Sequence, residues 1–148
     1  MERLILLIAI AALAAVAAQL IQRRRPSTPI RTGWTVPEQL DRDDFNCPDL
    51  PWLVAVFTSA TCESCSSVLA TAAPLESAEV AVQEVEVSAN QAIHDRYAID
   101  AVPMVLIVDR VGVVRGHHVG PVSATHLWGS LAEIRNPGST PDGCSVSS

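Results

Sequence analysis

Lysine is absent from the 148-residue chain, so its ten Lys-plus-Arg positions are all arginines, and the formal net charge is −6. Three of the ten, Arg23, Arg24 and Arg25, follow an apolar run near the N-terminus. The rest of the chain is therefore more acidic than the total. Because domains that bind nucleic acid carry a basic surface, this balance argues against nucleic acid as a partner.

Cysteine is also scarce. The four cysteines are Cys47, Cys62, Cys65 and Cys144. Four residues, of which only two stand close together, do not make a disulfide framework. A structural zinc site needs four ligands, and the chain has no second CxxC pair. The spare soft ligands, Cys47, Cys144, His117 and His118, have no finger-like spacing. The sequence therefore predicts no metal site.

One long apolar run stands out from the rest of the chain. From Leu4 to Ile21 it contains a single polar residue, and as a helix it spans about 27 Å, close to the hydrocarbon thickness of a bilayer. A cleaved signal peptide is the alternative, but its positive charge precedes the apolar run. Here the dense charge follows it. We therefore expect a retained single-pass transmembrane helix in residues 1–25.

The same arginines bear on the orientation of this anchor. Arginine-rich flanks stay in the cytoplasm, which places the globular part on the cytoplasmic side. An extracytoplasmic location stays open, because a disulfide between Cys47 and Cys144 would indicate an oxidising compartment. The sequence does not decide whether these two cysteines pair.

Beyond the anchor, composition divides the chain into three parts. Residues 26–35 are rich in proline and hydroxyl side chains and predict a short linker. Residues 36–135 carry the apolar periodicities of one folded domain, and residues 136–148 have the composition of a disordered tail. We expect strands at 52–58, 80–87, 103–109 and 113–119, and helices at 37–45, 62–73, 89–99 and 123–134.

This order of elements predicts an α/β domain. Strands that alternate with helices imply a parallel sheet covered on both faces, and the closing hairpin adds antiparallel strands. The 80–87 segment has one irregular step at Gln83–Glu84 in its alternation of valines. Ser123 is expected to cap the last helix. His94 and His126 are expected on helix surfaces, and Cys47 is expected to be partly buried in a turn.

Cys62 and Cys65 follow the first buried strand and open the predicted helix at 62–73. The first turn of a helix has unpaired N–H groups and a partial positive charge, which stabilise a thiolate. Two residues between the cysteines bring the sulfur atoms close enough for a disulfide. We expect Cys62 to be the more exposed, attacking thiol and Cys65 the resolving one. The plainer interpretation is two small core residues.

Three stretches together make residues 36–135 resemble the thioredoxin family. The first is "WLVAVFTSATCESC", a strand that leads into the CxxC pair. The second is "ANQAIHDRYAIDAVPMVLIVDRVGVV", with a Val-Pro before a strand. The third is "HHVGPVSATHLWGSL", a strand that ends in Val-Gly and is followed by the last helix. The resemblance implies a thioredoxin-like fold, in which a central mixed sheet is flanked by helices.

The resemblance also implies a substrate groove. Pro103 would be a cis-proline that faces the cysteine pair, and the backbone of Val102 would pair with an extended substrate segment. Gly120 would close the groove beyond the last strand. Thr61 stands beside Cys62, at the position of the family's usual tryptophan.

The sequence departs from the family pattern in four ways. Besides Thr61, Glu63–Ser64 replace the usual Gly-Pro, Val56 replaces a buried aspartate that handles the proton of the second cysteine, and the accompanying lysine falls near Glu84. Glu63 places a negative charge beside Cys62 and disfavours its thiolate. We therefore expect slower disulfide exchange than in a standard thioredoxin, with Glu84 or a water as the remaining proton acceptor.

These features predict a membrane-tethered thiol–disulfide oxidoreductase that acts on protein thiols and disulfides. It would need no bound cofactor, because the disulfide itself carries two electrons, but it would need a partner as electron donor or acceptor. Two alternatives stay open. One is a non-catalytic binding module with a thioredoxin-like fold. The other is a redox sensor at the membrane, in which Cys144 closes onto the cysteine pair.

Overall fold

A computed structural model describes residues 33–138 of the chain. Its elements, in order, are the 3-10 helix η1 (Arg42–Asp44), strand β1 (Trp52–Thr58), helix α2 (Cys65–Ala72), the 3-10 helix η2 (Ala73–Leu75), strand β2 (Val80–Glu86), helix α3 (Gln91–Arg96), strands β3 (Met104–Val108) and β4 (Val114–Val119), and helix α4 (Ala124–Arg135). The expected anchor, most of the linker and most of the tail lie outside the described residues. Within residues 33–138, no helix is both long and apolar enough to cross a membrane.

The strands form one mixed sheet in the order β2-β1-β3-β4. The pair β1–β2 is parallel, whereas β3 is antiparallel to β1 and β4 is antiparallel to β3. Helix α3 is the helix between β2 and β3, and its six residues span about 9 Å, so it does not return along a seven-residue strand of about 23 Å as a crossover helix would. The chain therefore enters β3 at the same end of the sheet at which it leaves β2.

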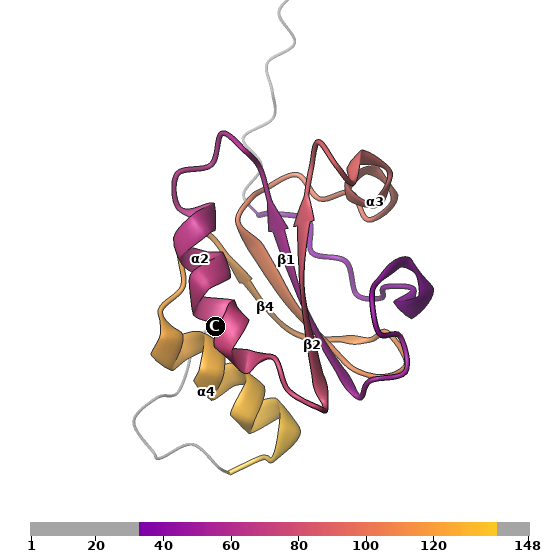
Figure 1. Ribbon diagram of the computed structural model, residues 1–148, viewed down its shortest axis with the longest axis vertical. Coiled ribbons are helices and arrows are strands. Elements are labelled where there is room, and N and C mark those ends of the chain that lie inside the picture. The colour runs from indigo at the N-terminus through magenta and orange to yellow at the C-terminus, as the bar shows by residue number, and fades with distance from the viewer. Residues whose placement is uncertain (1–32, 139–148) are drawn as a thin grey trace, which may run out of the picture. The chain divides into compact units, whose positions relative to one another are not determined.

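The two faces of the sheet are covered by different elements (Figure 1). Helices α2 and α4 lie on one face, and α3 and η1 lie on the other. Because successive side chains of a strand point to opposite faces, the continuous apolar run of β1 supplies both cores. Leu53 and Phe57 pack toward α3 and η1, and Val54 and Val56 pack toward α2 and α4. The sequence-based prediction of a central buried strand is confirmed.

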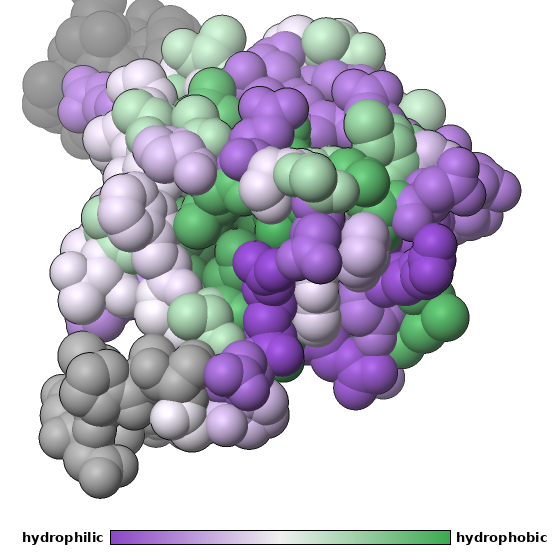
Figure 2. All heavy atoms as spheres, turned by 60° about the horizontal axis from the view of Figure 1, so that its bottom comes forward, coloured by the Kyte–Doolittle hydropathy of each residue, from purple (hydrophilic) through white to green (hydrophobic). Residues whose placement is uncertain are grey.

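The outer surface is uneven in polarity (Figure 2). In that view, hydrophilic side chains gather on one half of the visible face, and a strip of apolar side chains runs beside them. Large apolar side chains that are exposed in the described residues include Trp34, Val111 and Trp128.

Three predicted helices are shorter in the structure. The one expected at 37–45 is only η1, because Gln39 pairs with Val113 in an isolated bridge and so holds the preceding backbone extended. Helix α3 ends early, where Ala98 takes a positive φ of 52°. Helix α2 begins at Cys65 instead of Cys62. The last helix is as expected, and the Ser123 side chain accepts a hydrogen bond from the N–H of His126.

Candidate active site

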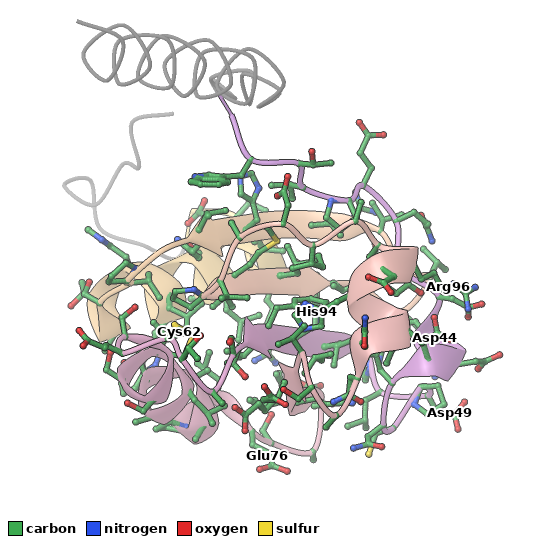
Figure 3. The ribbon with its side chains drawn as sticks, turned by 90° about the horizontal axis from the view of Figure 1, so that it is seen from above. Asp44, Asp49, Cys62, Glu76, His94 and Arg96 are labelled. Carbon is green, nitrogen blue, oxygen red and sulfur yellow. A yellow bond between two sulfur atoms is a disulfide. The ribbon has the colours of Figure 1, made fainter. Side chains whose placement is uncertain are left out.

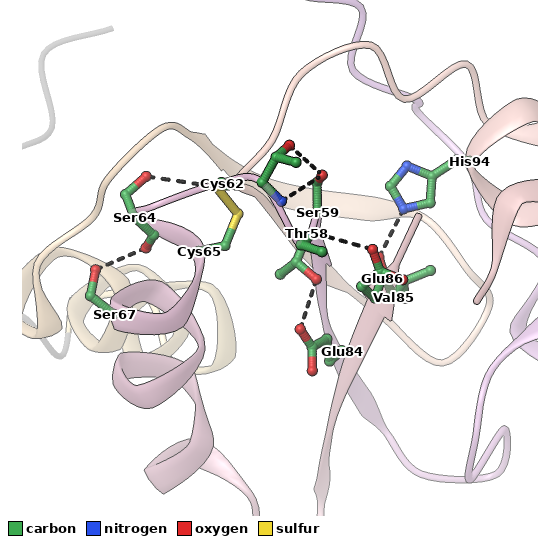
Figure 4. Close-up of a disulfide and its surroundings, with 12 residues drawn as sticks. Thr58, Ser59, Cys62, Ser64, Cys65, Ser67, Glu84, Val85, Glu86 and His94 are labelled. Atoms are coloured by element: carbon green, nitrogen blue, oxygen red, sulfur yellow. Dashed lines mark hydrogen bonds between the residues drawn. A yellow bond between two sulfur atoms is a disulfide. The ribbon is translucent and has the colours of Figure 1, made fainter. Parts of the chain in front are cut away.

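Cys62 and Cys65 form a disulfide between the end of β1 and the start of α2, with their Cα atoms 5.4 Å apart (Figure 4). Cys65 is the first residue of α2 and only 4% exposed, and Cys62 is partly exposed. The expected difference in exposure is therefore present. The expected place of Cys62 in the first helical turn is wrong, because it lies three residues before the helix. The helix dipole acts first on Cys65.

The loop that carries Cys62 is built from tight turns. The N–H of Cys62 donates to the carbonyl of Ser59 over 3.0 Å, and the N–H of Cys65 donates to the carbonyl of Cys62 over 3.4 Å. These two successive turns use the backbone groups that an earlier helix start would need, which explains why α2 begins only at Cys65. The hydroxyl of Ser64 lies 3.9 Å from the sulfur of Cys62.

Two carboxylates of β2 accept hydrogen bonds from the end of β1 and from the segment between β1 and Cys62. Thr58, only 1% exposed, donates its hydroxyl to Glu84 over 2.7 Å. The N–H of Ala60 donates to Glu86 over 3.2 Å. Val80 packs into the core under α2 and α4, and with a period of two, Glu84 and Glu86 share its face. The pairing of β1 with β2 is regular throughout, so the irregular spacing of the valines places Val80 and Val82 on one face and Val85 on the other.

The predicted groove residues meet at the same end of the sheet as the disulfide. Phe57, at the end of β1, is paired with Met104, at the start of β3. Immediately before it, the Val102–Pro103 peptide bond is cis. Gly120, with a positive φ of 89°, donates its N–H to the carbonyl of Pro103 over 2.8 Å.

Around Gly120 the site is open. A Cβ atom built on this glycine would meet nothing within 4 Å. Among residues 33–138, Val102 makes no backbone hydrogen bond. Thr61 is exposed in the loop before Cys62, and its side-chain oxygen lies 3.2 Å from that of Ser59. The structure therefore brings the strand ends that carry Thr61, Val102, Pro103 and Gly120 to one end of the sheet.

No protein-family model and no curated protein matches the chain. Among solved structures it is similar to a mutant thioredoxin from Halobacterium salinarum NRC-1, with a TM-score of 0.55 and 24% identity over 67% of this chain and 87% of that one. The fold is thioredoxin-like. A malarial protein is similar with a TM-score of 0.52 and 13% identity, over 57% of this chain and 97% of that one. At these identities the likeness establishes the fold alone.

In this thioredoxin-like domain, Arg96 contacts Asp41 and Asp44 beside η1, on the side of the sheet opposite Cys62 (Figure 3). Further ion pairs of the described residues join Arg115 to Asp109 and Arg135 to Glu79. No group of three or more His, Cys, Asp or Glu side chains within residues 33–138 is arranged to hold a metal ion.

Two expectations about single residues are wrong. His94 is 3% exposed instead of lying on a helix surface, because its ring packs edge-on against Phe57 and its Nε2 lies 2.8 Å from the carbonyl oxygen of Val85. Cys47 is exposed instead of partly buried, in a turn where its φ is 53°. Cys144 lies outside the described residues, so its pairing stays a prediction. His126 is exposed, as expected.

Glu86 and Thr58 are the residues near the disulfide that the sequence analysis did not single out. The signal for Glu86 was the period-two spacing of Val80, Val82, Glu84 and Glu86, which places all four on one face. Thr58 gave no comparable signal, because it is one hydroxyl residue at the end of an otherwise apolar run.

Proposed function

We propose that this protein is a thiol–disulfide oxidoreductase that acts on protein disulfides. The observation that carries the proposal is the partly exposed Cys62 joined to the buried Cys65 at the open end of a thioredoxin-like sheet. A pair in this arrangement is accessible to a substrate through one sulfur only, as exchange through a mixed disulfide requires.

The reaction runs in two steps that balance. In the reduced protein, the Cys62 thiolate attacks one sulfur of a substrate disulfide, and the other substrate sulfur leaves as a thiolate. The Cys65 thiolate then attacks the Cys62 sulfur and releases the second substrate thiolate. Two electrons pass to the substrate, and the Cys62–Cys65 disulfide is left for a partner dithiol to reduce. The same steps in reverse oxidise a substrate.

An extended substrate segment would lie beside Val102. The backbone of Val102 has no hydrogen-bond partner within the described residues, so both of its polar groups are open to a substrate strand. Pro103 and Gly120 form the floor and the far end of this groove, and Thr61 borders it on the side of Cys62. This is the role that we propose for the four residues.

We further propose that the apolar residues 4–21 tether the domain to a membrane, on the cytoplasmic side by the arginine bias. Tethering raises the effective concentration of the domain toward partners in the same membrane. Protein thiols and disulfides at the membrane are therefore the proposed substrates.

A non-catalytic binding module is the second candidate, and one observation favours it. Val56 is fully buried and points into the core under α2 and α4, so β1 supplies no carboxylate that accepts the proton of Cys65. On the neighbouring strand, the carboxylate of Glu84 stands at the position paired with Val56. Turnover measurements separate the two candidates.

The test uses the full chain in detergent, a disulfide-linked protein substrate and dithiothreitol as electron donor. We expect substrate reduction above the rate with dithiothreitol alone, loss of that excess in Cys62→Ser, and unchanged turnover in Cys47→Ser. Absence of the excess in the folded wild-type protein would favour the binding module.

A further inference from the structure

The carboxylate of Glu86, the last residue of β2, receives donors from two segments. Its Oε1 accepts the N–H of Ala60, as Figure 4 shows, and the hydroxyl of Ser88, each over 3.2 Å. Its Oε2 accepts the N–H of Ala89 over 3.0 Å. Ala60 belongs to the loop before Cys62, and the other two donors belong to the turn between β2 and α3.

The turn between β2 and α3 is itself fixed by backbone hydrogen bonds. The N–H of Val87 donates to the carbonyl of Thr58 over 3.0 Å, which extends the pairing of β1 with β2. The N–H of Asn90 donates to the backbone carbonyl of Glu86 over 2.9 Å. The carboxylate therefore projects from backbone that is fixed on both sides.

The loop from Ser59 to Glu63 has little other support. Its remaining hydrogen bonds are local, between Ser59 and Thr61, between Ser59 and Cys62, and between Cys62 and the start of α2. Within residues 33–138, the bond from Ala60 to Glu86 is the one hydrogen bond that ties this loop to a neighbouring strand. Opening the disulfide removes the sulfur–sulfur link from Cys62 to α2 but leaves the donor and the acceptor of this hydrogen bond chemically unchanged.

We propose that Glu86 is a positioning residue for disulfide exchange. Its carboxylate holds the loop so that Cys62 stays beside Cys65 in the reduced protein and in the mixed disulfide. An unfixed loop would gain conformational freedom in the reduced state but not in the oxidised state, and disulfide closure would have to remove that freedom again. The inference rests on the proposed function.

The charge state of Glu86 supports this role. The backbone N–H of Ser88, with those of Ala89 and Ala60 and the Ser88 hydroxyl, keeps the pKa of Glu86 below its ordinary value against the opposing effect of burial. At neutral pH the group is therefore a charged acceptor, and hydrogen bonds to charged groups are the stronger ones. Ala60 and Ser88 share Oε1, whereas Ala89 uses Oε2. A glutamine in place of Glu86 has one oxygen for these two positions, so the bond to Ala60 is either lost or made to an uncharged acceptor.

The test compares Glu86→Gln with Glu76→Gln in the full chain in detergent. Glu76 is an exposed carboxylate of the same domain, far from α3 and the disulfide loop in sequence, with only its backbone N–H bonded, to Ala73. The first readout is an equilibrium constant measured in glutathione buffers. In this reaction the protein disulfide and two molecules of reduced glutathione give the protein dithiol and one molecule of glutathione disulfide. The constant gives the effective concentration of the Cys62 thiol with respect to the Cys65 thiol.

We expect Glu86→Gln to lower that effective concentration, and kcat/KM for a protein disulfide, by about tenfold, the size of a lost hydrogen bond to a charged group. Glu76→Gln should match the wild-type protein in both. A purely structural role for Glu86 would lower the unfolding midpoint and leave the thiol equilibrium of the folded protein unchanged. A folded Glu86→Gln protein with wild-type values would overturn the proposal.

Amide exchange at Ala60 in the wild-type protein tests the same proposal without a variant. The Ala60 N–H should be protected in the oxidised and in the reduced protein, and exchange at the rate of an unstructured chain in the reduced protein would overturn it. If the wild-type protein fails to turn over any disulfide substrate, the proposed function fails. The thiol equilibrium and the exchange at Ala60 still decide whether Glu86 positions the loop.

Discussion

The two faces of one sheet are covered in different ways. On one face, α2 and α4 pack apolar side chains such as Val68, Leu127 and Leu131 against the strands. On the other, the short α3 and η1 add a polar network to their apolar contacts. The Tyr97 hydroxyl donates to Asp44 and accepts the N–H of Asp41, and Arg96 pairs with both carboxylates.

The difference follows from element length. Helix α4 has twelve residues and α2 has eight, enough to cover strands with an apolar stripe. Helix α3 has six and η1 has three, so side-chain hydrogen bonds fix their positions. The cysteine pair stands on the face covered by α2 and α4, the packed face, where α2 supplies Cys65. Both faces have an apolar core, and the opposite, polar face adds the network of Tyr97, Arg96, Asp41 and Asp44 to its core.

The largest expected effect comes from the packed face. Leu127 is fully buried between α4 and the sheet, so Leu127→Ala should lower the free energy of unfolding by about 3 kcal/mol. The loss should be equal at low and high salt, because no charge is involved. Denaturant titrations at two salt concentrations measure both. A loss below about 1 kcal/mol would show that this face depends less on packing than we infer.

Tyr97→Phe tests the polar face. It removes the hydroxyl between Asp44 and the Asp41 N–H and should cost about 1.5 kcal/mol. Burial, followed by the hydrogen bond to Asp44, raises the pKa of Tyr97 above 10.0. This contribution to stability is therefore complete below pH 10 and is lost as pH rises through the raised pKa. Unfolding midpoints between pH 8 and pH 11 should fall in the wild-type protein, and less in the variant.

His118 is the titrating exception on the packed face. It lies on β4, with Nε2 3.1 Å from the hydroxyl of Ser130 on α4. Burial, followed by the charges of His117 and His126, lowers its pKa below 6.5. Its contribution is complete above pH 6.5 and is lost as pH falls through the lowered pKa. Between pH 7 and pH 5, the His118→Gln protein should therefore lose less stability than the wild-type protein. We expect this difference to be smaller than the difference between Tyr97→Phe and the wild-type protein from pH 8 to pH 11. Identical pH profiles for the variant and the wild-type protein would show that His118 does not contribute to this pH dependence.

The smallest expected effect is at the exposed pair of Arg135 and Glu79, which joins the end of α4 to the start of β2. Both side chains are at least one-third exposed, and such pairs contribute about 0.5 kcal/mol or less. Arg135→Gln should change the unfolding midpoint barely measurably, and less at high salt. A cost comparable to that of Leu127→Ala would show that the packed face also depends on charge.

The sequence predicted the elements whose signal is local. The buried runs that became β1 and β3 are continuous and apolar, and the CxxC spacing indicated the disulfide. The start of α2 was misplaced, because it depends on two turns through Ser59 and Cys62 that leave no periodic pattern in the sequence. His94 was assigned to a surface, because its burial depends on a ring contact with Phe57, 37 residues away in the chain.

The carboxylates of β2 show a second limit of prediction from the sequence. The strand is regular and lies at the edge of the sheet, where Glu84 is exposed and Glu86 is partly exposed. Thr58 and Ala60 donate hydrogen bonds to these carboxylates from the neighbouring strand and the loop that follows it. A hydrogen bond between residues 26 positions apart gives no pattern in the sequence of either segment.

The central claim is that Cys62 attacks and Cys65 resolves, and trapping tests it most directly. Cys65→Ala, in a full chain that also carries Cys47→Ser and Cys144→Ser, should form a mixed disulfide with a protein disulfide substrate, one substrate per chain, released by dithiothreitol. The adduct should be absent when Cys62 is also replaced by alanine. A folded Cys65→Ala protein that forms no adduct would contradict the account.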